Sequence, residues 1–309
     1  MKVYKGSCCN NLYVQALKDC LTLANPTHSR AGSVYDLGPS VFEFEPGKLN
    51  FLTLKNRALN PFFAIAEAAW VIGGENKLDI LNYYIKSYDN FSDDKIILNG
   101  AYGFRLRQYF GFDQIRTAIN ELKESPHSRR CVLNMYGPAD LINKTSKDIP
   151  CNTSIMLKIR EGALDITIIN RSNDIYWGIP YNLFVFQVLH CYLAKEIGVE
   201  LGYQRHFTDS LHLYERNVKE IKIILDNHKD SSEQLFSFER LDLIYMILSE
   251  IDNINHRKFN LIKVKALRET MIMFEKYKNN LESNCFEIDT GNKLLNFLIK
   301  EWSFKYAKK

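Results

Sequence analysis

A cysteine, an arginine, a serine and an aspartate flank a stretch with strand-like alternation. Cys151 follows Pro150 at one end, and Arg171, Ser172 and Asp174 follow at the other. Because a hairpin brings its ends together, we expect these side chains to share one neighbourhood. A guanidinium beside a thiol favours the thiolate, which is the nucleophilic form. The pattern therefore indicates a candidate site for covalent catalysis, although a lone cysteine is more often a small core residue.

Two further pairs of residues could bind a phosphorylated ligand. Arg129 and Arg130 precede an apolar run at 131–135 that predicts a short buried strand, and adjacent arginines can clamp a phosphate through paired hydrogen bonds. His212 and Tyr214 alternate along another strand-like stretch, so both side chains would face a ligand hydroxyl from the same side. Each pair has an ordinary alternative: two solvated charges in the first case and two packed rings in the second.

A single carboxylate interrupts an otherwise apolar helix. The stretch from Pro61 to Gly73-Gly74 is apolar nearly all round, which predicts a buried helix with a glycine C-terminus. Its one charge is Glu67. A carboxylate buried there without a partner would be strongly unfavourable. Glu67 therefore either reaches a partner or a cavity, or lies at an edge of the helix in contact with water.

Helices and strands along the chain must position these residues. A polar loop at 29–33 leads into a strand at 41–45, and strands at 154–159 and 164–168 form a hairpin with Gly162 in its loop. We therefore expect the middle of the chain to be a sheet. Helical periodicity predicts helices at 10–23, 182–197, 218–225, 238–251, 262–277 and 293–306.

Composition and charge narrow the class of protein. Of 309 residues, 46% are hydrophobic and 25% are charged, which is typical of a folded soluble chain. No apolar run approaches the roughly 18 residues that span a bilayer, so we expect a cytoplasmic protein without a membrane segment. A net charge of +4 suits an anionic ligand but does not indicate nucleic-acid binding. The 7 cysteines form no CxxC pair, which argues against a disulfide framework and against a metal site.

Taken together, these motifs resemble the thymidylate synthase family. They occur in the family's order, and the resemblance covers about 14–217. The motifs are Arg129-Arg130, Pro150-Cys151, Arg171-Ser172-x-Asp174-x-x-x-Gly178-x-Pro180-x-Asn182 and His212-x-Tyr214. The resemblance implies an α+β fold, in which a large mixed β-sheet packs against helices. We therefore expect a thymidylate synthase-like catalytic domain at 1–217 and an α-helical C-terminal extension at 218–309.

The resemblance also implies a reaction and its partners. In the family the cysteine, here Cys151, adds to C6 of a uracil ring, and C5 then attacks the methylene group of the cosubstrate 5,10-methylenetetrahydrofolate. Catalytic roles fall on Cys151, Glu67, Tyr102 and Asn182. Substrate-binding roles fall on Arg30, Arg171, Ser172, His212 and Tyr214, with Arg129 and Arg130 donated across the interface of a homodimer. Cofactor-binding roles fall on Lys55, Tyr88, Asp174 and Gly178.

Asn182 bears on the choice of base. Its amide offers an acceptor and a donor that match N3 and O4 of uracil, so we favour dUMP as the substrate. An amide can also turn over to suit cytosine, but cytidylate hydroxymethylases of this family carry aspartate at this place. dCMP is therefore the alternative substrate.

The reaction has two possible endings. Hydride from tetrahydrofolate would reduce the exocyclic methylene to methyl and give dTMP, whereas water would give a 5-hydroxymethyl product. Relatives exclude water with a tryptophan and a short apolar C-terminal tail, but here Tyr88 and Phe91 occupy the tryptophan region and helices follow the catalytic domain. Asn152 also replaces the usual histidine after the nucleophile. Family frequency favours thymidylate synthase, and a dUMP or dCMP 5-hydroxymethylase is the alternative.

A nucleotide-sensing relative without activity is a third interpretation. Under this interpretation the helical extension would act as an interaction module. Cys151, Glu67 and Asp174 are all present, and a protein that had lost its activity would have had no reason to retain the three together. We therefore favour an enzyme over a sensor.

Overall fold

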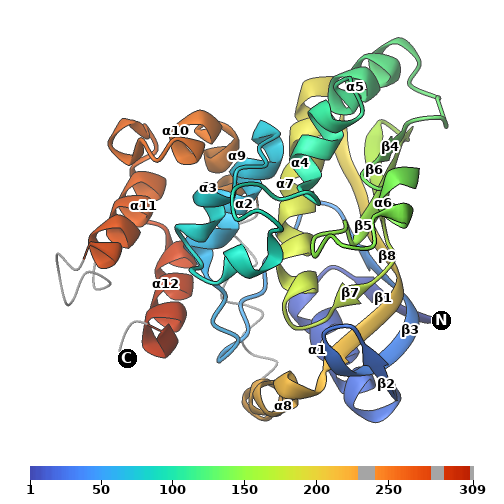
Figure 1. The fold of residues 1–309 in the computed structure, drawn as a ribbon. Helices are drawn as coiled ribbons and strands as arrows, with labels where there is room; N and C mark the ends of the chain where they lie inside the picture. The colour runs from blue at the N-terminus through green and yellow to red at the C-terminus, as the bar shows by residue number, and fades with distance from the viewer. Residues whose placement is uncertain (229–240, 280–288, 307–309) are drawn as a thin grey trace.

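A single mixed sheet organises the chain in a computed structural model that describes residues 1–228, 241–279 and 289–306. The strand order is β1-β3-β8-β6-β5-β4, with β2 paired to β3 and β7 paired to β8. The long helices α2 and α7 lie on one side of this sheet (Figure 1). The strands are β1 Lys2–Gly6, β2 Asn25–Ser29, β3 Gly32–Phe44, β4 Val132–Asn134, β5 Asn152–Arg160, β6 Ala163–Asn170, β7 Asn173–Asp174 and β8 Glu200–Tyr214.

Twelve α-helices accompany the sheet in the described part of the chain. None of them is long and apolar enough to cross a membrane. The helices before β8 are α1 Cys9–Thr22, α2 Pro61–Gly73, α3 Leu78–Asn82, α4 Tyr102–Phe104, α5 Gln114–Glu124, α6 Pro138–Ile142 and α7 Gly178–Ile197. Those after β8 are α8 Val218–Asn227, α9 Asp242–Leu248, α10 Ile251–Asn255, α11 Lys265–Lys278 and α12 Lys293–Tyr306. The α+β class expected from the motifs is thus confirmed.

The hairpin of β5 and β6 places the two ends of the candidate site together. Its turn contains Glu161 and Gly162, whose φ values of 51° and 77° suit a tight two-residue connection. From this turn β5 and β6 pair antiparallel as far as Asn152 and Asn170. The two ends of the hairpin therefore meet, and the Arg171 N–H donates to the Cys151 carbonyl at 2.9 Å. The hairpin prediction is confirmed, including the proximity of its ends.

Capping residues, glycine and proline set the ends of α2 and the start of α7. In α2 the Asn60 side chain accepts from the Phe63 N–H at 3.0 Å, and Gly74 closes the helix with a φ of 74°. Helix α7 begins at Gly178, four residues before the predicted start at 182, because Pro180 is tolerated in a first turn whose N–H groups need no partner. The helix predicted from Pro61 to Gly73 is confirmed.

Two local predictions are wrong. The apolar run at 131–135 is not a buried strand: β4 lies at the edge of the sheet, paired only with β5, and leaves Val132 46% exposed. The loop predicted at 29–33 shrinks to Arg30 and Ala31, because β2 and β3 extend into it as a hairpin. In both cases strand pairing, which a local pattern cannot show, decided the outcome.

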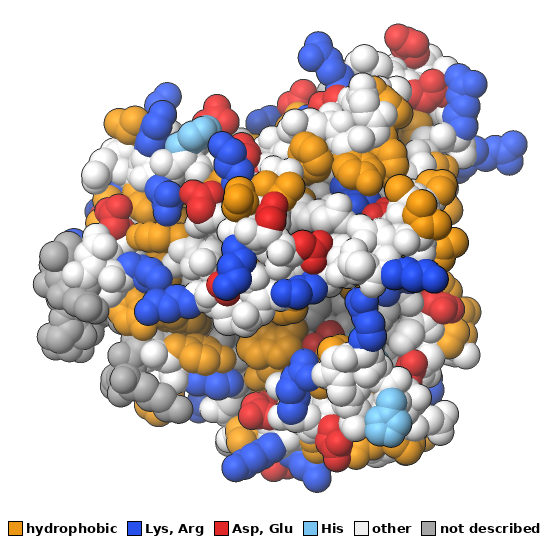
Figure 2. Space-filling model, in the orientation of Figure 1, with side chains coloured by type: hydrophobic (Ala, Val, Ile, Leu, Met, Phe, Trp, Pro, Cys, Tyr) orange, Lys and Arg blue, Asp and Glu red, His pale blue; other side chains and the backbone are white. Residues whose placement is uncertain are grey.

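The C-terminal helices share the core of the catalytic part. The Phe62 ring of α2 lies 4.7 Å from the Phe274 ring of α11 and 5.2 Å from the Trp302 ring of α12. Hydrophobic side chains remain visible where these helices, on the left of Figure 2, meet the part of the chain that carries the sheet. The helical character predicted for 218–225, 262–277 and 293–306 is confirmed. Of the single helix predicted at 238–251, residues 238–240 lie outside the described residues, and the remainder is wrong as one helix because α9 ends at Leu248 and α10 begins at Ile251.

Phe274→Ala should lower the free energy of unfolding by about 3–5 kcal/mol, because it leaves a cavity among the aromatic rings that join α11 to α2. The ring is 1% exposed. Urea denaturation of the full chain measures the effect, and Leu261→Ala, at a side chain that is 61% exposed, is the matched control. A loss no larger than that of the control would mean that the C-terminal helices are not part of the cooperative core.

Candidate active site

Cys151 lies immediately before β5, half-buried, with a guanidinium held against it. The Nε of Arg171 donates to the Pro150 carbonyl at 2.9 Å, and its Nη2 donates to the Ile149 carbonyl at 3.0 Å. The same Nη2 lies 3.7 Å from the Cys151 sulfur. Because two backbone carbonyls fix the guanidinium, its position beside the thiol is set by the fold rather than by a ligand.

Opposing effects act on the pKa of Cys151. Burial is the largest and raises the pKa, the charge of Arg171 lowers it, Asp148 and Asp174 raise it, and Arg30 lowers it. The net direction is upward, so the thiol keeps its proton in the free protein. A ligand or a neighbouring base must therefore assist its conversion to the nucleophilic thiolate. Arg30, in the turn between β2 and β3, is thus close enough to act on the same group as Arg171.

The short strand β7 joins a second group of predicted residues. Asp174 pairs with His212 across β7 and β8, and the Ser172 hydroxyl lies 3.4 Å from Nδ1 of His212. The His212 and Tyr214 rings meet edge to face at 5.2 Å, on one side of β8. Burial raises the pKa of Asp174 even though its Oδ1 accepts from the Tyr176 N–H at 2.8 Å. These four side chains therefore lie together, as predicted.

Glu67 lies in the interior beside two tyrosines. Burial raises the pKa of its carboxyl group to about 8, and its Oε2 has no hydrogen-bond partner among the described residues. Burial also raises the pKa values of Tyr88 and Tyr102, to which the charge of Glu67 contributes. The charge of Cys151 also raises the pKa of Tyr102, so the carboxylate and the thiol both influence this ring. Oε2 of Glu67 is therefore shielded from water, although the residue as a whole is half-buried.

Asn182 and Gly178 are linked through Asn173. The Asn182 amide nitrogen donates to Oδ1 of Asn173 at 3.4 Å, on the first turns of α7. A Cβ atom added to Gly178 would lie 2.2 Å from the same oxygen, which leaves room for glycine alone. Gly178 thus has a packing reason for its identity, and its predicted contact with a cofactor stays a prediction.

A buried arginine near the site was not predicted. Lys55, the residue proposed for the folate tail, is exposed, whereas Arg57 is 1% exposed. Its guanidinium donates to the Tyr176 carbonyl and lies 4.2 Å from the ring of Tyr176 and 5.5 Å from that of Trp177. Cation–π contact with two rings partly offsets the cost of burying this charge. The signal that could have indicated it was an arginine close to Leu54 on one side and to Ala58 and Leu59 on the other.

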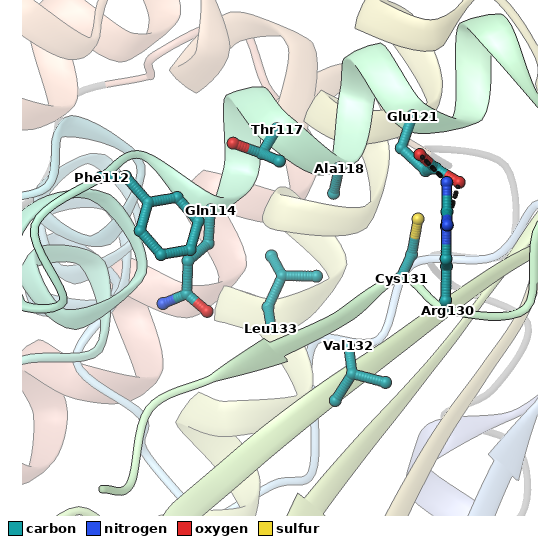
Figure 3. A pocket seen from close by; sticks show the side chains of 9 residues that line it. All are labelled: Phe112, Gln114, Thr117, Ala118, Glu121, Arg130, Cys131, Val132 and Leu133. Atoms are coloured by element: carbon teal, nitrogen blue, oxygen red, sulfur yellow. Dashed lines mark hydrogen bonds and ion pairs between the residues drawn. The ribbon is translucent and has the colours of Figure 1, made fainter.

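Arg130 is paired with Glu121 and lines a pocket that does not include Cys151. Its Nε and Nη2 donate to the two carboxylate oxygens of Glu121 at 2.9 and 3.2 Å. Figure 3 shows this pair at the rim of a pocket of about 260 Å³ between α5 and β4. Cys131 lines that pocket and Cys151 does not. The donation of Arg129 and Arg130 to a partner's site stays a prediction.

With this geometry described, comparison with known proteins places the chain in a family. A family model described as "Thymidylate synthase" matches residues 11–269, which is most of the chain. The chain belongs to the thymidylate synthase family. The match runs past residue 217, so it includes α8, α9, α10 and the start of α11, which we expected to fall outside the resemblance.

Individual relatives carry two different names. A deoxyuridylate hydroxymethyltransferase of Bacillus phage SP01 is 34% identical over 226 residues, covering 69% of this chain and 59% of the relative. A deoxyuridylate hydroxymethyltransferase of Pseudomonas phage M6 is 38% identical, covering 55% and 49%. A thymidylate synthase of Mycoplasma genitalium is 28% identical, covering 52% and 58%. The chain thus spans less than two thirds of the length of each of these relatives.

Glu67→Gln should flatten the pH dependence of stability. The native carboxyl group holds its proton up to about pH 8, whereas the unfolded chain releases it near 4.5. Between these values the native state binds more protons than the unfolded state, so the free energy of unfolding falls as the pH rises. Glutamine removes this contribution, and urea denaturation at several pH values in that window measures it. Glu124→Gln, at an exposed position of α5, is the control. An unchanged slope in Glu67→Gln would contradict the buried, protonated carboxyl group.

Proposed function

We propose that this chain transfers a one-carbon unit from 5,10-methylenetetrahydrofolate to C5 of dUMP in the cytoplasm. The observation that carries the proposal is the Cys151 sulfur 3.7 Å from a guanidinium that backbone carbonyls hold in place, in a member of the thymidylate synthase family. The thiolate would add to C6 of the base and make C5 nucleophilic toward the methylene group. Loss of tetrahydrofolate would then leave an exocyclic methylene on C5.

Each predicted binding residue has a task that suits its chemistry. Arg30, Arg171 and Ser172 would hold the nucleotide phosphate, and the two guanidinium groups also favour the thiolate of Cys151. His212 and Tyr214 would bind the sugar hydroxyl. The remaining residues would contact the base or the folate: Asn182 the uracil edge, Asp174 the pterin ring, and Lys55, Tyr88 and Gly178 the remainder of the folate.

Glu67 would move protons around the base with the help of Tyr102. A carboxyl group whose pKa is near 8 holds a proton at neutral pH and can also release it, which suits alternating acid and base roles. The charges of both this carboxyl group and the Cys151 thiol raise the pKa of Tyr102, so the tyrosine is near both groups. This arrangement supports a proton relay that begins at the nucleophile.

We favour water over hydride as the final reactant, and hence a 5-hydroxymethyl product. The relatives from Bacillus phage SP01 and Pseudomonas phage M6, which are 34% and 38% identical to this chain, are both named deoxyuridylate hydroxymethyltransferase. Tyr88, a residue with a polar hydroxyl, stands beside Glu67 where a tryptophan was expected, and the buried amide of Asn152 follows the nucleophile. These polar groups favour an ordered water near the reacting carbon.

A methyl product, dTMP, is the second candidate, and one contact favours it. The backbone N–H of Asn56 donates to Oε2 of Glu301 at 3.0 Å, so α12 lies against the loop that carries Lys55 and Arg57. A helix in this position could exclude water from the folate, which is what hydride transfer requires. Family frequency, on which the sequence-based preference for thymidylate synthase rested, also supports this outcome.

We infer that the chain forms a homodimer through the sheet face opposite α2 and α7. Four apolar side chains lie in register across that face, namely Val3, Val41, Phe207 and Ile169, and Val3 is 57% exposed. A row of alternating charge runs beside them over five neighbouring strands: Lys158, Asp165, Arg205, Glu43 and Lys5. A second copy related by a two-fold axis would meet the same apolar row and a self-complementary row of charges.

Cys151→Ser should lower turnover about 10³-fold or more, because the hydroxyl is a far weaker nucleophile than the thiolate. The assay incubates the full chain with dUMP or dCMP and methylenetetrahydrofolate, measures product mass and follows dihydrofolate by absorbance. A hydroxymethyl product without dihydrofolate supports the favoured ending, and a methyl product with it supports the second. Cys8→Ser is the control, and nucleotide binding without turnover of either nucleotide in the wild type would favour a sensor.

Mixing Cys151→Ser subunits with Arg129→Ala/Arg130→Ala subunits should restore activity to about a quarter of the wild-type value. Half of the dimers are then mixed, and each mixed dimer has one intact site if the arginines come from the partner. The measurement is the turnover of re-equilibrated mixtures, with sedimentation to establish the dimer. No recovery above the two separate variants would contradict arginine donation across the interface.

A further inference from the structure

Four polar side chains lie side by side on the inner face of the sheet, in a row that begins at the residue after the nucleophile. Asn152 of β5 pairs with Asn170 of β6, which pairs with Thr208 of β8, which pairs with Ser40 of β3. All four are 0% exposed. Inner faces of sheets normally carry apolar side chains, as Ile166 and Ile168 do on the same strand as Asn170.

Two members of this row have hydrogen-bonding atoms without partners in the described structure. Asn170 donates to the Phe207 carbonyl at 3.1 Å and Ser40 donates to the Gly38 carbonyl at 3.2 Å. In contrast, the Thr208 hydroxyl and both amide atoms of Asn152 have no partner of full hydrogen-bond geometry among the described residues. The Asn152 amide nevertheless lies near enough to the Tyr102 hydroxyl to lower its pKa. Buried polar atoms of this kind are usually satisfied by ordered water.

His206 supplies a fourth unpartnered atom among the described residues, two residues before Thr208 and on the same face of β8. The Gln204 amide is oriented from two sides: Asn50 donates to its oxygen at 3.2 Å and its nitrogen donates to the Leu183 carbonyl at 2.9 Å. That nitrogen lies 2.8 Å from Nε2 of His206, so Nε2 must accept.

The proton of the neutral imidazole therefore lies on Nδ1 of His206. Burial lowers the pKa of this ring to about 3, which keeps it neutral. Nδ1 has no partner in the described part of the chain and is a free donor. Edge contacts with Phe44 at 6.4 Å and Phe186 at 5.9 Å hold the ring, and Phe186 in turn contacts Tyr102 at 5.9 Å.

We propose that Asn152, Thr208 and His206 bind ordered water at the inner face of the sheet, and that this interior site supplies the water that ends the reaction. Nδ1 of His206 donates to the water, the Thr208 hydroxyl can donate or accept, and the Asn152 amide connects the site to the nucleophile's side of the sheet. Thr208 and His206 act through water and are positioning residues. The existence of the site is independent of the proposed function, whereas its role in catalysis rests on that function.

The chemical step is balanced with water as the only added reactant. The water oxygen forms a bond to the exocyclic methylene carbon, and the C=C electrons move to C5 and O4 of the base. These electrons then re-form the C5–C6 double bond while the C6–S bond breaks and returns its electron pair to Cys151. The proton lost by water passes to Glu67 or to the interior water, and tetrahydrofolate is not oxidised.

The site itself is tested by diffraction and by stability. A high-resolution crystal structure of the full chain should contain a water within hydrogen-bond distance of Thr208 Oγ1 or His206 Nδ1, and Thr208→Val should lose it. If the hydroxyl binds water, Thr208→Val does not raise the melting temperature. A raised melting temperature, together with no such water in the wild type, would overturn the proposal, because replacing a truly unpartnered hydroxyl by a methyl group is stabilising. Thr270→Val, at a 0% exposed threonine that donates to the Ala266 carbonyl at 2.8 Å, is the control.

The catalytic role is tested by comparing two steps in the same variants. Thr208→Val and His206→Leu should reduce hydroxymethyl product about 10-fold or more, while loss of the C5 hydrogen of dUMP to solvent changes less than about 2-fold. A general defect in folding would lower both rates together and would overturn the role. Wild-type protein that turns over no nucleotide would reject the proposed function, while the crystal and melting data would still decide whether the water site exists.

Discussion

The backbone hydrogen bond between Arg171 N–H and the Cys151 carbonyl is the constraint on which the site depends. It closes the β5–β6 hairpin, and it places the guanidinium beside the sulfur before any ligand arrives. Two more carbonyls, of Ile149 and Pro150, hold the guanidinium from the other side. An electrostatic environment built from backbone groups needs no rearrangement during the reaction, which is the basis of preorganised catalysis.

A few buried polar groups in the protein lower its stability but are suited to catalysis. A protonated carboxyl group on α2, a neutral imidazole on β8 and a thiol with a raised pKa all lie in surroundings that a purely structural core would fill with aliphatic side chains. Their cost is offset by the large apolar contact between α2 and the C-terminal helices, in which Phe62, Phe274 and Trp302 pack together. Polar groups of this kind are therefore expected near reacting atoms rather than throughout the fold.

Local patterns predicted much of this fold, and they failed where pairing between distant segments decides. Apolar periodicity placed α2 and the hairpin correctly, and motif order brought Ser172, Asp174 and His212 together. The edge position of β4 depends on which strands pair, and no window of sequence contains that information. Arg57 and His206 were missed for the same reason, since a charged or polar residue in a strand or loop looks exposed until its neighbours are known.

The contact between Asn56 and Glu301 joins two segments that are far apart in the order of synthesis. The loop at 55–57 leaves the ribosome early, and Glu301 leaves it 245 residues later. A nascent chain can therefore form the strands of the sheet, which end at Tyr214, before the loop at 55–57 meets its contact on α12. Until α12 has been synthesised this loop lacks its hydrogen bond to Glu301, so the final contact of the loop forms late in synthesis.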